Sequence, residues 1–219
     1  NLCTEITLHT KASTYDKGEK IETGETAVCN LGSINLTNHI REHISSEGDI
    51  TIGINWTALS ETTDTALRML DNVVDLNFYP TKESENSNLR HRPIGLGLMG
   101  LHDVLHRMNI VIDSKEAIDF SDKLFECYTK NAIFASSKLA KERGSYNTYS
   151  GSLWDQGCLP IDSYNNLMTY RGSNNQVEET LSEWEEVRSH IKKYGMRNSN
   201  VTAIAPTATI GYINGVEQS

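Results

Sequence analysis

The sequence predicts an α/β fold with parallel strands, because short apolar strands are separated by long amphipathic helices. Residues 27–36, AVCNLGSINL, carry apolar side chains on both faces, which is typical of a strand buried in a parallel sheet. Residues 200–206, NVTAIAP, form a second apolar strand, which a proline closes. Three long helical segments lie between these two strands, as parallel pairing requires.

Two of the helices are predicted from apolar spacing together with signals at their ends. Residues 56–78 keep apolar side chains at helical spacing, and Pro80 follows them. A longer helix opens at Asp113-Ser114, with Glu116 placed for a capping box, and runs to Arg143, with Gly144 as its stop. Both helices are long enough to cover a sheet.

The third helix and the main loops complete the outline. Ser182 and Glu185 make a capping box for a helix that ends at Gly195. Residues 11–25 are polar and punctuated by glycine, which predicts a loop or the tip of a hairpin. Residues 145–179 are predicted to be rich in loops.

The composition is that of a globular protein and narrows the range of partners. The 219 residues contain 20 Lys and Arg against 29 Asp and Glu, and the net charge of −9 argues against a nucleic-acid polymer or an anionic membrane surface. No apolar window approaches the length of a membrane-spanning helix and no signal sequence is recognised, so we expect a cytoplasmic location. Both ends look cut, so we expect a fragment of a longer protein.

The four cysteines, at positions 3, 29, 127 and 158, include no CxxC pair, so the sequence predicts neither a zinc ribbon nor a disulfide framework. Cys127 shares a helical stripe with Leu124 and is expected to pack in the core. Cys158 lies in a loop with no basic residue nearby to activate it, and we assign it no role.

The first six residues, NLCTEI, combine an amide, a thiol and a carboxylate. If this segment is extended, alternate residues point the same way, so Asn1, Cys3 and Glu5 share one face. Cys29, by contrast, lies inside the predicted buried strand.

The stretch GLGLMG places Gly95, Gly97 and Gly100 in a GxGxxG pattern. In a dinucleotide-binding fold this turn follows a strand, but here it follows NSNLRHRP, which is too polar for a central strand. We therefore expect these glycines to permit close packing of helices. A nicotinamide-dependent dehydrogenase that uses GLGLMG stays as an alternative.

Two pairs of histidines, His102 with His106 and His39 with His43, have the spacing of metal ligands one helical turn apart. Neither pair has the glutamate of an HExxH motif or an obvious third ligand. We interpret them as surface histidines and predict no metal site.

The last segment, AIAPTATIG, places Thr207 and Thr209 directly after the strand 200–206. Backbone N–H groups at such a turn, next to the start of a helix, make a nest suited to phosphate. Taken alone, this feature also fits a non-catalytic module that binds nucleotide phosphates.

Together these segments resemble the catalytic large subunit of ribonucleotide reductases. The matching stretches cover nearly the whole chain and are NLCTEI, AVCNLGSINL, DLNFYP, RHRPIGLGLMGLHDVL, SYNTYSGSLWDQGCLPID, YGMRNSN and AIAPTATIGYINGVEQS. The resemblance implies part of a ten-stranded α/β barrel of the ribonucleotide reductase and glycyl-radical type. It divides this partial barrel domain, residues 1–219, into a finger loop (1–10), a barrel strand (27–36), a helical and loop region (56–195) and a phosphate-loop strand and turn (200–215).

The resemblance also implies a reaction, the reduction of ribonucleotides to deoxyribonucleotides, with diphosphates favoured as substrates. Cys3 matches the cysteine whose thiyl radical removes the 3′-hydrogen of the substrate, and Glu5 matches the base that takes the 3′-hydroxyl proton. Asn1 matches an amide that hydrogen-bonds the sugar hydroxyls. Cys29 matches one of two cysteines that reduce the substrate and end as a disulfide.

Binding partners follow from the same resemblance. Pro206, Thr207, Ala208 and Thr209 match the loop that holds the substrate's phosphates. No cofactor is expected in this segment itself: a metal-containing small subunit, favoured over adenosylcobalamin, supplies the radical, and ATP and deoxynucleotide effectors bind outside it. The remaining parts of the large subunit and a thioredoxin or glutaredoxin are the other expected partners. The fragment alone is expected to be inactive.

Overall fold

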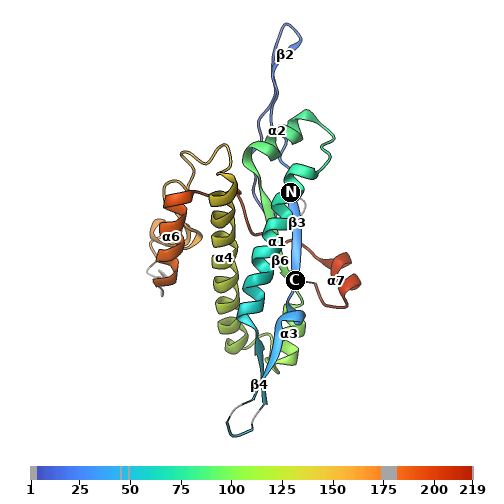
Figure 1. Ribbon diagram of the computed structural model, residues 1–219, viewed down its shortest axis with the longest axis vertical. Coiled ribbons are helices and arrows are strands. Elements are labelled where there is room, and N and C mark those ends of the chain that lie inside the picture. The colour runs from blue at the N-terminus through green and yellow to red at the C-terminus, as the bar shows by residue number, and fades with distance from the viewer. Residues whose placement is uncertain (1–3, 45, 49, 174–181, 219) are drawn as a thin grey trace.

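The computed structural model describes residues 4–44, 46–48, 50–173 and 182–218. The strands and helices, in chain order, are β1 (Thr14–Asp16), β2 (Glu19–Glu22), β3 (Asn30–Asn35), the 3-10 helix η1 (Leu36–His39), β4 (Ile40–Ile44), β5 (Ile50–Ile54), α1 (Trp56–Leu76), α2 (Lys82–His91), β6 (Ile94–Met99), α3 (Leu101–Arg107), α4 (Lys115–Arg143), α5 (Pro160–Tyr170), α6 (Ser182–Tyr194) and α7 (Ala208–Asn214). Helices α1 and α4 lie side by side along the parallel strands, and the hairpins β1–β2 and β4–β5 project from opposite ends (Figure 1). The hairpin β1–β2 confirms the predicted hairpin tip.

The central sheet is parallel, as predicted. β3 pairs with β6 in parallel along its whole length. Residues 200–203 run parallel to the other edge of β6, where the N–H of Leu96 donates to the carbonyl of Val201 (3.0 Å) and the N–H of Ala203 donates to the carbonyl of Leu96 (2.9 Å). The first predicted strand is therefore present as β3, and the second is reduced to residues 200–203.

The glycine-rich stretch itself forms β6, IGLGLM, and every residue of it is buried. The expectation that its glycines permit helix packing is wrong, because they permit strands to pack. A Cβ atom on Gly95 would lie 2.6 Å from Cδ2 of Leu31 and 2.8 Å from Cβ of Ala203, and one on Gly97 would lie 2.6 Å from the carbonyl oxygen of Ala203. Only Gly100 (φ +79°) belongs to the turn before α3, so GLGLMG is not the strand–turn–helix junction of a dinucleotide site.

Helices α1 and α4 match two of the predicted helices closely. The side chain of Asn55 caps α1 by accepting the N–H of Ala58 (3.2 Å). Ser114 caps α4 by accepting the N–H of Ala117 (3.1 Å), so Glu116 does not occupy the capping-box position predicted for it. Among the described helices, none is both long and apolar enough to cross a membrane.

Helix α6 matches the third predicted helix and packs against α4. Gly195 (φ +77°) ends it, as expected, whereas the predicted capping box depends on the side chain of Ser182, which lies outside the described part of the chain. The apolar stripe of α6 is buried in the core with residues of α1 and α4. The buried members of this core that belong to the three helices include Leu67, Val74, Ala132, Ile133, Ala135, Leu139, Trp184, Val187 and Ile191.

A second core cluster lies between the sheet and the helices. The fully buried Tyr128 of α4 donates its hydroxyl hydrogen to the carbonyl of Leu96, and burial raises the pKa of that hydroxyl. Leu124, one turn earlier, is also fully buried. Leu124 is therefore a core residue, as expected, whereas Cys127, on the same helical stripe, is only half-buried.

Several elements give no clear signal in the sequence. The region 145–179, predicted to be rich in loops, contains α5, where the carboxylate of Asp162 accepts the N–H of Leu159 (2.6 Å). Helix α2, KESENSNLRH, has no apolar stripe and is held by a capping box between Thr81 and Ser84 and by polar residues in its buried face. Hairpin β4–β5 is exposed over most of its length.

The carboxylate of Asp71 in α1 is fully buried (0 % exposed) and forms ion pairs with several arginine side chains. Arg92, which precedes β6, donates to it at 2.7 and 3.0 Å, and Arg143, at the end of α4, donates at 2.8 Å. Arg197 lies 3.4 Å from the carboxylate, and Nδ2 of Asn198 donates at 3.2 Å. The network ties α1 and α4 to β6 and to the segment that leads into residues 200–203.

The substitution Asp71→Ala is expected to lower the free energy of unfolding by about 3–5 kcal/mol. The buried guanidinium of Arg92 would lose one of its two carboxylate partners and keep only Asp75, and Arg143 would lose its ion pair with Asp71. The matched control is Asp64→Ala, which removes a half-exposed ion pair with Lys138 (2.8 Å) and should cost less than about 1 kcal/mol. Urea unfolding of both variants measures the difference. Equal losses in the two variants would contradict a special role for Asp71.

Candidate functional site

One face of the parallel strands carries no helix in the part of the chain that the structure describes. A Cβ atom on Gly32 would contact α1 at 3.4 Å, so its neighbours Leu31 and Ser33 point to the opposite side, where Leu31 is 45 % exposed. Cys29, just before β3, shares this side, because a Cβ atom on Gly95 would lie 3.5 Å from its Sγ. We call the surface formed by these four side-chain positions, Cys29, Leu31, Ser33 and Gly95, the open face.

The thiol of Cys29 is half-buried, and its Sγ lies 3.7 Å from the carbonyl oxygen of Asn30, to which it donates. Burial and, second, the charge of Glu5 raise the pKa of Cys29 to about 12. The thiol therefore stays protonated at neutral pH and is suited to giving a hydrogen rather than to attack as a thiolate. Oγ of Ser33, on the same face, is buried without a hydrogen-bond partner among the described residues.

Glu5 is half-buried and lies close enough to Cys29 for its charge to act on the thiol. Asn1 and Cys3, the other two residues predicted for the site, lie outside the described residues. The chain bends at Thr4 and Glu5, and Thr4 has φ +63°, which is unusual for a β-branched residue. The premise of a fully extended segment is therefore wrong at Thr4, and the shared orientation of Cys3 and Glu5 stays a prediction.

The predicted phosphate-binding residues connect the strand-like segment to α7. Thr207 is buried (3 % exposed) and caps α7, where its carbonyl accepts the N–H of Gly211 at 2.6 Å. Pro206 and the first two residues of α7, Ala208 and Thr209, are exposed. A turn followed directly by a helix is thus present where the sequence predicts one, whereas phosphate binding there stays a prediction.

The predicted site residues that the structure describes lie at two ends of the parallel strands. Cys29 precedes β3 at the amino ends of the strands, and Glu5 lies near it. The segment 206–209 follows residues 200–203 beyond the carboxyl end of the third strand. The structure therefore places Cys29 within reach of the charge of Glu5 and separates Cys29 from the phosphate segment along the strand direction.

The histidine pairs have different surroundings. His102 and His106 are exposed on α3, which confirms their interpretation as surface residues. His39 is buried (7 % exposed), and its ring nitrogens lie 3.0 and 2.9 Å from protein oxygen atoms, so the surface interpretation is wrong for it. The side chain of His43 lies outside the described part of the chain.

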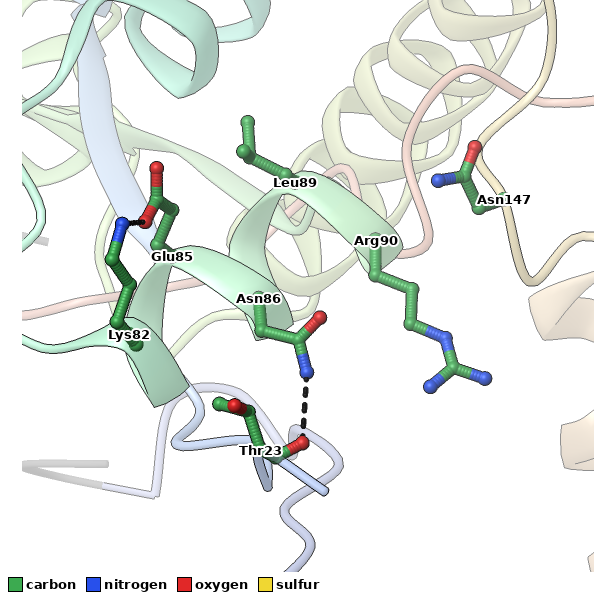
Figure 2. Close-up of a pocket in the computed structure, with 7 residues that line it drawn as sticks. All are labelled: Thr23, Lys82, Glu85, Asn86, Leu89, Arg90 and Asn147. Carbon is green, nitrogen blue, oxygen red and sulfur yellow. Dashed lines mark hydrogen bonds and ion pairs between the residues drawn. The ribbon is translucent and has the colours of Figure 1, made fainter. Parts of the chain in front are cut away.

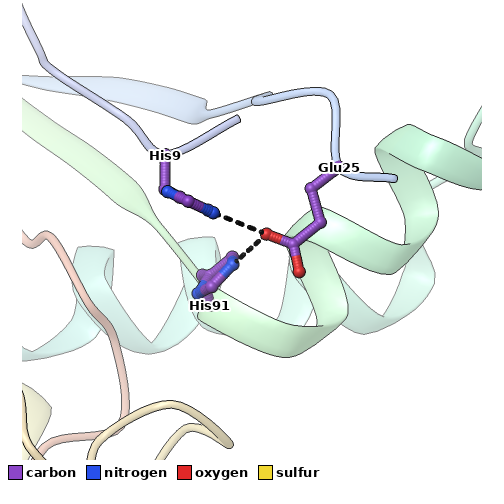
Figure 3. Close-up of side chains that lie close together, drawn as sticks. All are labelled: His9, Glu25 and His91. Carbon is purple, nitrogen blue, oxygen red and sulfur yellow. Dashed lines mark hydrogen bonds and ion pairs between the residues drawn. The ribbon is translucent and has the colours of Figure 1, made fainter. Parts of the chain in front are cut away.

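A cluster that the sequence does not signal brings together His9, Glu25 and His91 (Figure 3). Nε2 of His91 lies 2.6 Å from Oε2 of Glu25, and Nε2 of His9 lies 3.4 Å from the same oxygen. Burial alone would raise the pKa of Glu25, but the hydrogen bond from His91 and the charges of His91 and Arg90 outweigh it, so that pKa lies below its ordinary value. The three residues are far apart in the sequence, which hides the cluster.

A polar pocket lies along one side of α2 (Figure 2), and one of the residues that line it holds the segment just before Glu25. Its cavity of about 460 Å³ is bounded by Asn86, Arg90 and other residues of α2 together with Thr23 and Asn147. Nδ2 of Asn86 donates to the carbonyls of Thr23 (3.2 Å) and Gly24 (3.0 Å) and so docks this segment on the helix. The predicted catalytic and phosphate-binding residues that the structure describes do not line this pocket.

All of residues 1–219 match the family model described as ribonucleotide reductase, barrel domain. The chain belongs to this family. The ribonucleoside-diphosphate reductase subunit alpha of Chlamydia pneumoniae is 52 % identical over 221 residues, which are 100 % of this chain and 19 % of that protein. The corresponding subunit of Helicobacter pylori strain J99 is 38 % identical over 93 % of this chain and 25 % of its own length, and the large subunit of Monkeypox virus is 36 % identical over 100 % of this chain and 24 % of its own length.

The match confirms the predicted family and fold class. The parallel strands β3 and β6, with the helices that cover them, are part of the α/β barrel domain of the ribonucleotide reductase family. The chain spans about a fifth to a quarter of the length of these relatives.

The substitution Glu5→Gln is expected to speed alkylation of Cys29 by iodoacetamide, because it removes one of the two causes that raise the pKa of this thiol. With a pKa of about 12 in place of 9.0, the thiolate fraction near neutral pH is about a thousandfold lower than for an ordinary cysteine. We expect a gain of roughly two- to tenfold in rate, measured for each cysteine by mass spectrometry. The control Glu19→Gln changes an exposed glutamate of β2 and should leave the rate unchanged. Identical rates in both variants would exclude the coupling.

Proposed function

We propose that the protein to which this chain contributes reduces ribonucleoside diphosphates to deoxyribonucleotides by thiyl-radical chemistry. The relatives named above are called ribonucleoside-diphosphate reductases, and the chain matches them over nearly all its residues. The single observation that carries the proposal is that the half-buried thiol of Cys29, on the open face, lies within reach of the charge of Glu5. A carboxylate and a protonated thiol are the base and the reductant that this reaction needs at one sugar.

Each residue has a defined task in the proposed reaction. A radical at Cys3 removes the 3′-hydrogen of the ribose and returns it at the end of the cycle. Glu5 takes the proton of the 3′-hydroxyl, which helps the 2′-hydroxyl to leave as water, and gives it back when the 3′-hydroxyl is restored. Asn1 hydrogen-bonds the sugar hydroxyls. Cys29 and a second thiol, which we expect outside this chain, supply two electrons and two protons and end as a disulfide.

The high pKa of Cys29 fits this task. A thiol that stays protonated at neutral pH keeps its one S–H hydrogen for the reaction, and the second thiol supplies the other, whereas a permanent thiolate would have none to give. The half-buried position of Cys29 also limits its access to solvent, which supports preorganised chemistry. The buried Oγ of Ser33 offers a polar contact on the same face.

Substrate binding is proposed to use the segment Pro206, Thr207, Ala208 and Thr209 for the phosphates. Cys29 lies at the amino ends of the strands and this segment beyond their carboxyl end, so the substrate would lie along the strands with its sugar at one end and its phosphates at the other. Binding energy from the phosphates would then hold the ribose against the reacting groups.

The proposed partners are the remaining parts of the large subunit, a small subunit, and a thioredoxin or glutaredoxin that reduces the disulfide. A metal-containing small subunit supplies the radical, in preference to adenosylcobalamin, and ATP and deoxynucleotide effectors bind elsewhere. We propose a cytoplasmic location. Residues 1–219 alone should lack activity, because β3 pairs on only one edge among the described residues and the open face has no cover there.

The substitution Cys3→Ser, made in the full-length protein that the gene encodes, is expected to abolish reductase activity while substrate binding is retained. A hydroxyl group cannot form the thiyl radical, whereas it leaves the shape of the site nearly unchanged. Activity is measured as deoxyribonucleotide formed, and binding as retention of labelled diphosphate. Cys158→Ser is the matched control and should keep full activity.

Retained activity in Cys3→Ser would overturn the radical assignment. If that variant also kept the biological role of the protein, a non-catalytic module that binds nucleotide phosphates would be the better description. The alternative of a nicotinamide-dependent dehydrogenase relied on GLGLMG as a phosphate-binding turn. Gly95 and Gly97 lie inside β6 rather than in a turn, so this motif no longer supports it.

A further inference from the structure

The cluster of His9, Glu25 and His91 has the composition of a metal site. Two imidazole nitrogens and one carboxylate oxygen lie within 4.8 Å of one another and come from three separate parts of the chain. His9 precedes β1, Glu25 lies between β2 and β3, and His91 ends α2. Figure 3 shows the three side chains directed toward one another. Imidazole and carboxylate groups are the ligands that zinc and related divalent cations accept.

Groups behind the ligands hold two of them in place. Nδ1 of His91 lies 2.7 Å from Oγ1 of Thr148, so an N–H at Nδ1 can donate to the threonine and leave Nε2 free to face the cluster. Oε1 of Glu25 accepts from Arg90 at 2.7 Å, which leaves Oε2 for the histidines. Metal ligands in proteins are commonly oriented by such outer contacts.

Burial and space also suit a bound ion. Only 1 % of the Glu25 side chain and 16 % of the His91 side chain are exposed, whereas His9 is 61 % exposed and can adjust. A cavity of about 190 Å³ is lined by His9, His91 and Thr148. It offers room for a water molecule as a fourth ligand and a path for entry.

We propose that His9, Glu25 and His91 bind a divalent cation of the zinc type through Nε2, Oε2 and Nε2. The metal replaces the proton that His91 shares with Glu25, and that proton passes to solvent. Ligand atoms around a tetrahedral zinc ion lie roughly 3.3 Å apart, so the contact of 2.6 Å between His91 and Glu25 must open slightly. Arg90 lies on the far oxygen of Glu25 and is 46 % exposed, so solvent screens its repulsion of the cation.

A metal at this site would cross-link two segments that carry predicted catalytic residues. His9 follows Cys3 and Glu5 in the first loop, and Glu25 lies four residues before Cys29. A metal bound to both segments would fix their separation without taking part in the reaction. The metal proposal itself does not depend on the proposed reductase function, because it rests on the geometry of three side chains.

Titration of the metal-free full-length protein with Co²⁺, followed by its visible d–d absorption, tests the proposal, and Zn²⁺ should displace the signal. We expect His9→Ala to lose one equivalent of bound Co²⁺ relative to the unmodified protein. Since the His9 side chain is largely exposed, the variant should fold normally, which circular dichroism verifies. Thr148→Val should weaken binding about tenfold, because His91 loses its outer partner.

The matched control is His102→Ala, which removes an exposed histidine of α3 and should leave the isotherm unchanged. Loss of one equivalent in His9→Ala but not in His102→Ala supports the site. An isotherm of His9→Ala that superimposes on that of the unmodified protein overturns it. Absence of stoichiometric binding by the unmodified protein also overturns it, and the cluster is then a proton-sharing contact only.

Discussion

The carboxylate of Asp71 collects guanidinium groups from the loop before β6, from the end of α4 and from the segment after α6. Burying a charged carboxylate costs free energy, and that cost is offset only when its ion-pair partners are in place. The relative positions of α1, α4 and the central strand are therefore coupled. Because Arg92 has a left-handed backbone (φ +49°) and leads directly into β6, the same network determines where that strand begins.

The start of β6 matters because the glycines of this strand shape the open face. Gly95 and Gly97 leave no side chain on the face that carries Cys29, so the third strand approaches closely and the open face stays shallow. The opposite face carries Leu96 and Leu98, which pack under the helices. One strand thus separates a tightly packed core from the open face, where Leu31 is 45 % exposed.

Prediction from the sequence succeeds where a spacing signal and a cap signal agree. Helices α1 and α4 have both, and their observed ends lie within two residues of the predicted ones. It fails for α2, because polar residues with mutual hydrogen bonds bury one side of that helix and leave no apolar stripe. It fails for β6 because a strand of alternating glycine has no side-chain pattern of its own and depends on its neighbours.

The site is predictable to a similar extent. The resemblance assigns Glu5 and Cys29 to one site because both belong to short recognisable motifs, and the effect of the Glu5 charge on the thiol agrees with that assignment, which stays a prediction. The cluster around Glu25 gives no such signal, because His9 and His91 come from distant segments that only the folded chain brings together. The bend at Thr4 is equally hidden, because a positive φ at a threonine is imposed by tertiary surroundings rather than by the residue.

The electrostatic interaction between Glu5 and Cys29 has a consequence for the protonation of both groups. Electrostatic influence between two acids is mutual, so a negative Glu5 disfavours a negative Cys29, and ionised sulfur would in turn make the carboxylate more basic. States with a single negative charge are therefore favoured over the doubly ionised state. Any event that neutralises the carboxylate lowers the free energy of forming the thiolate, which links the timing of one proton transfer to that of the other.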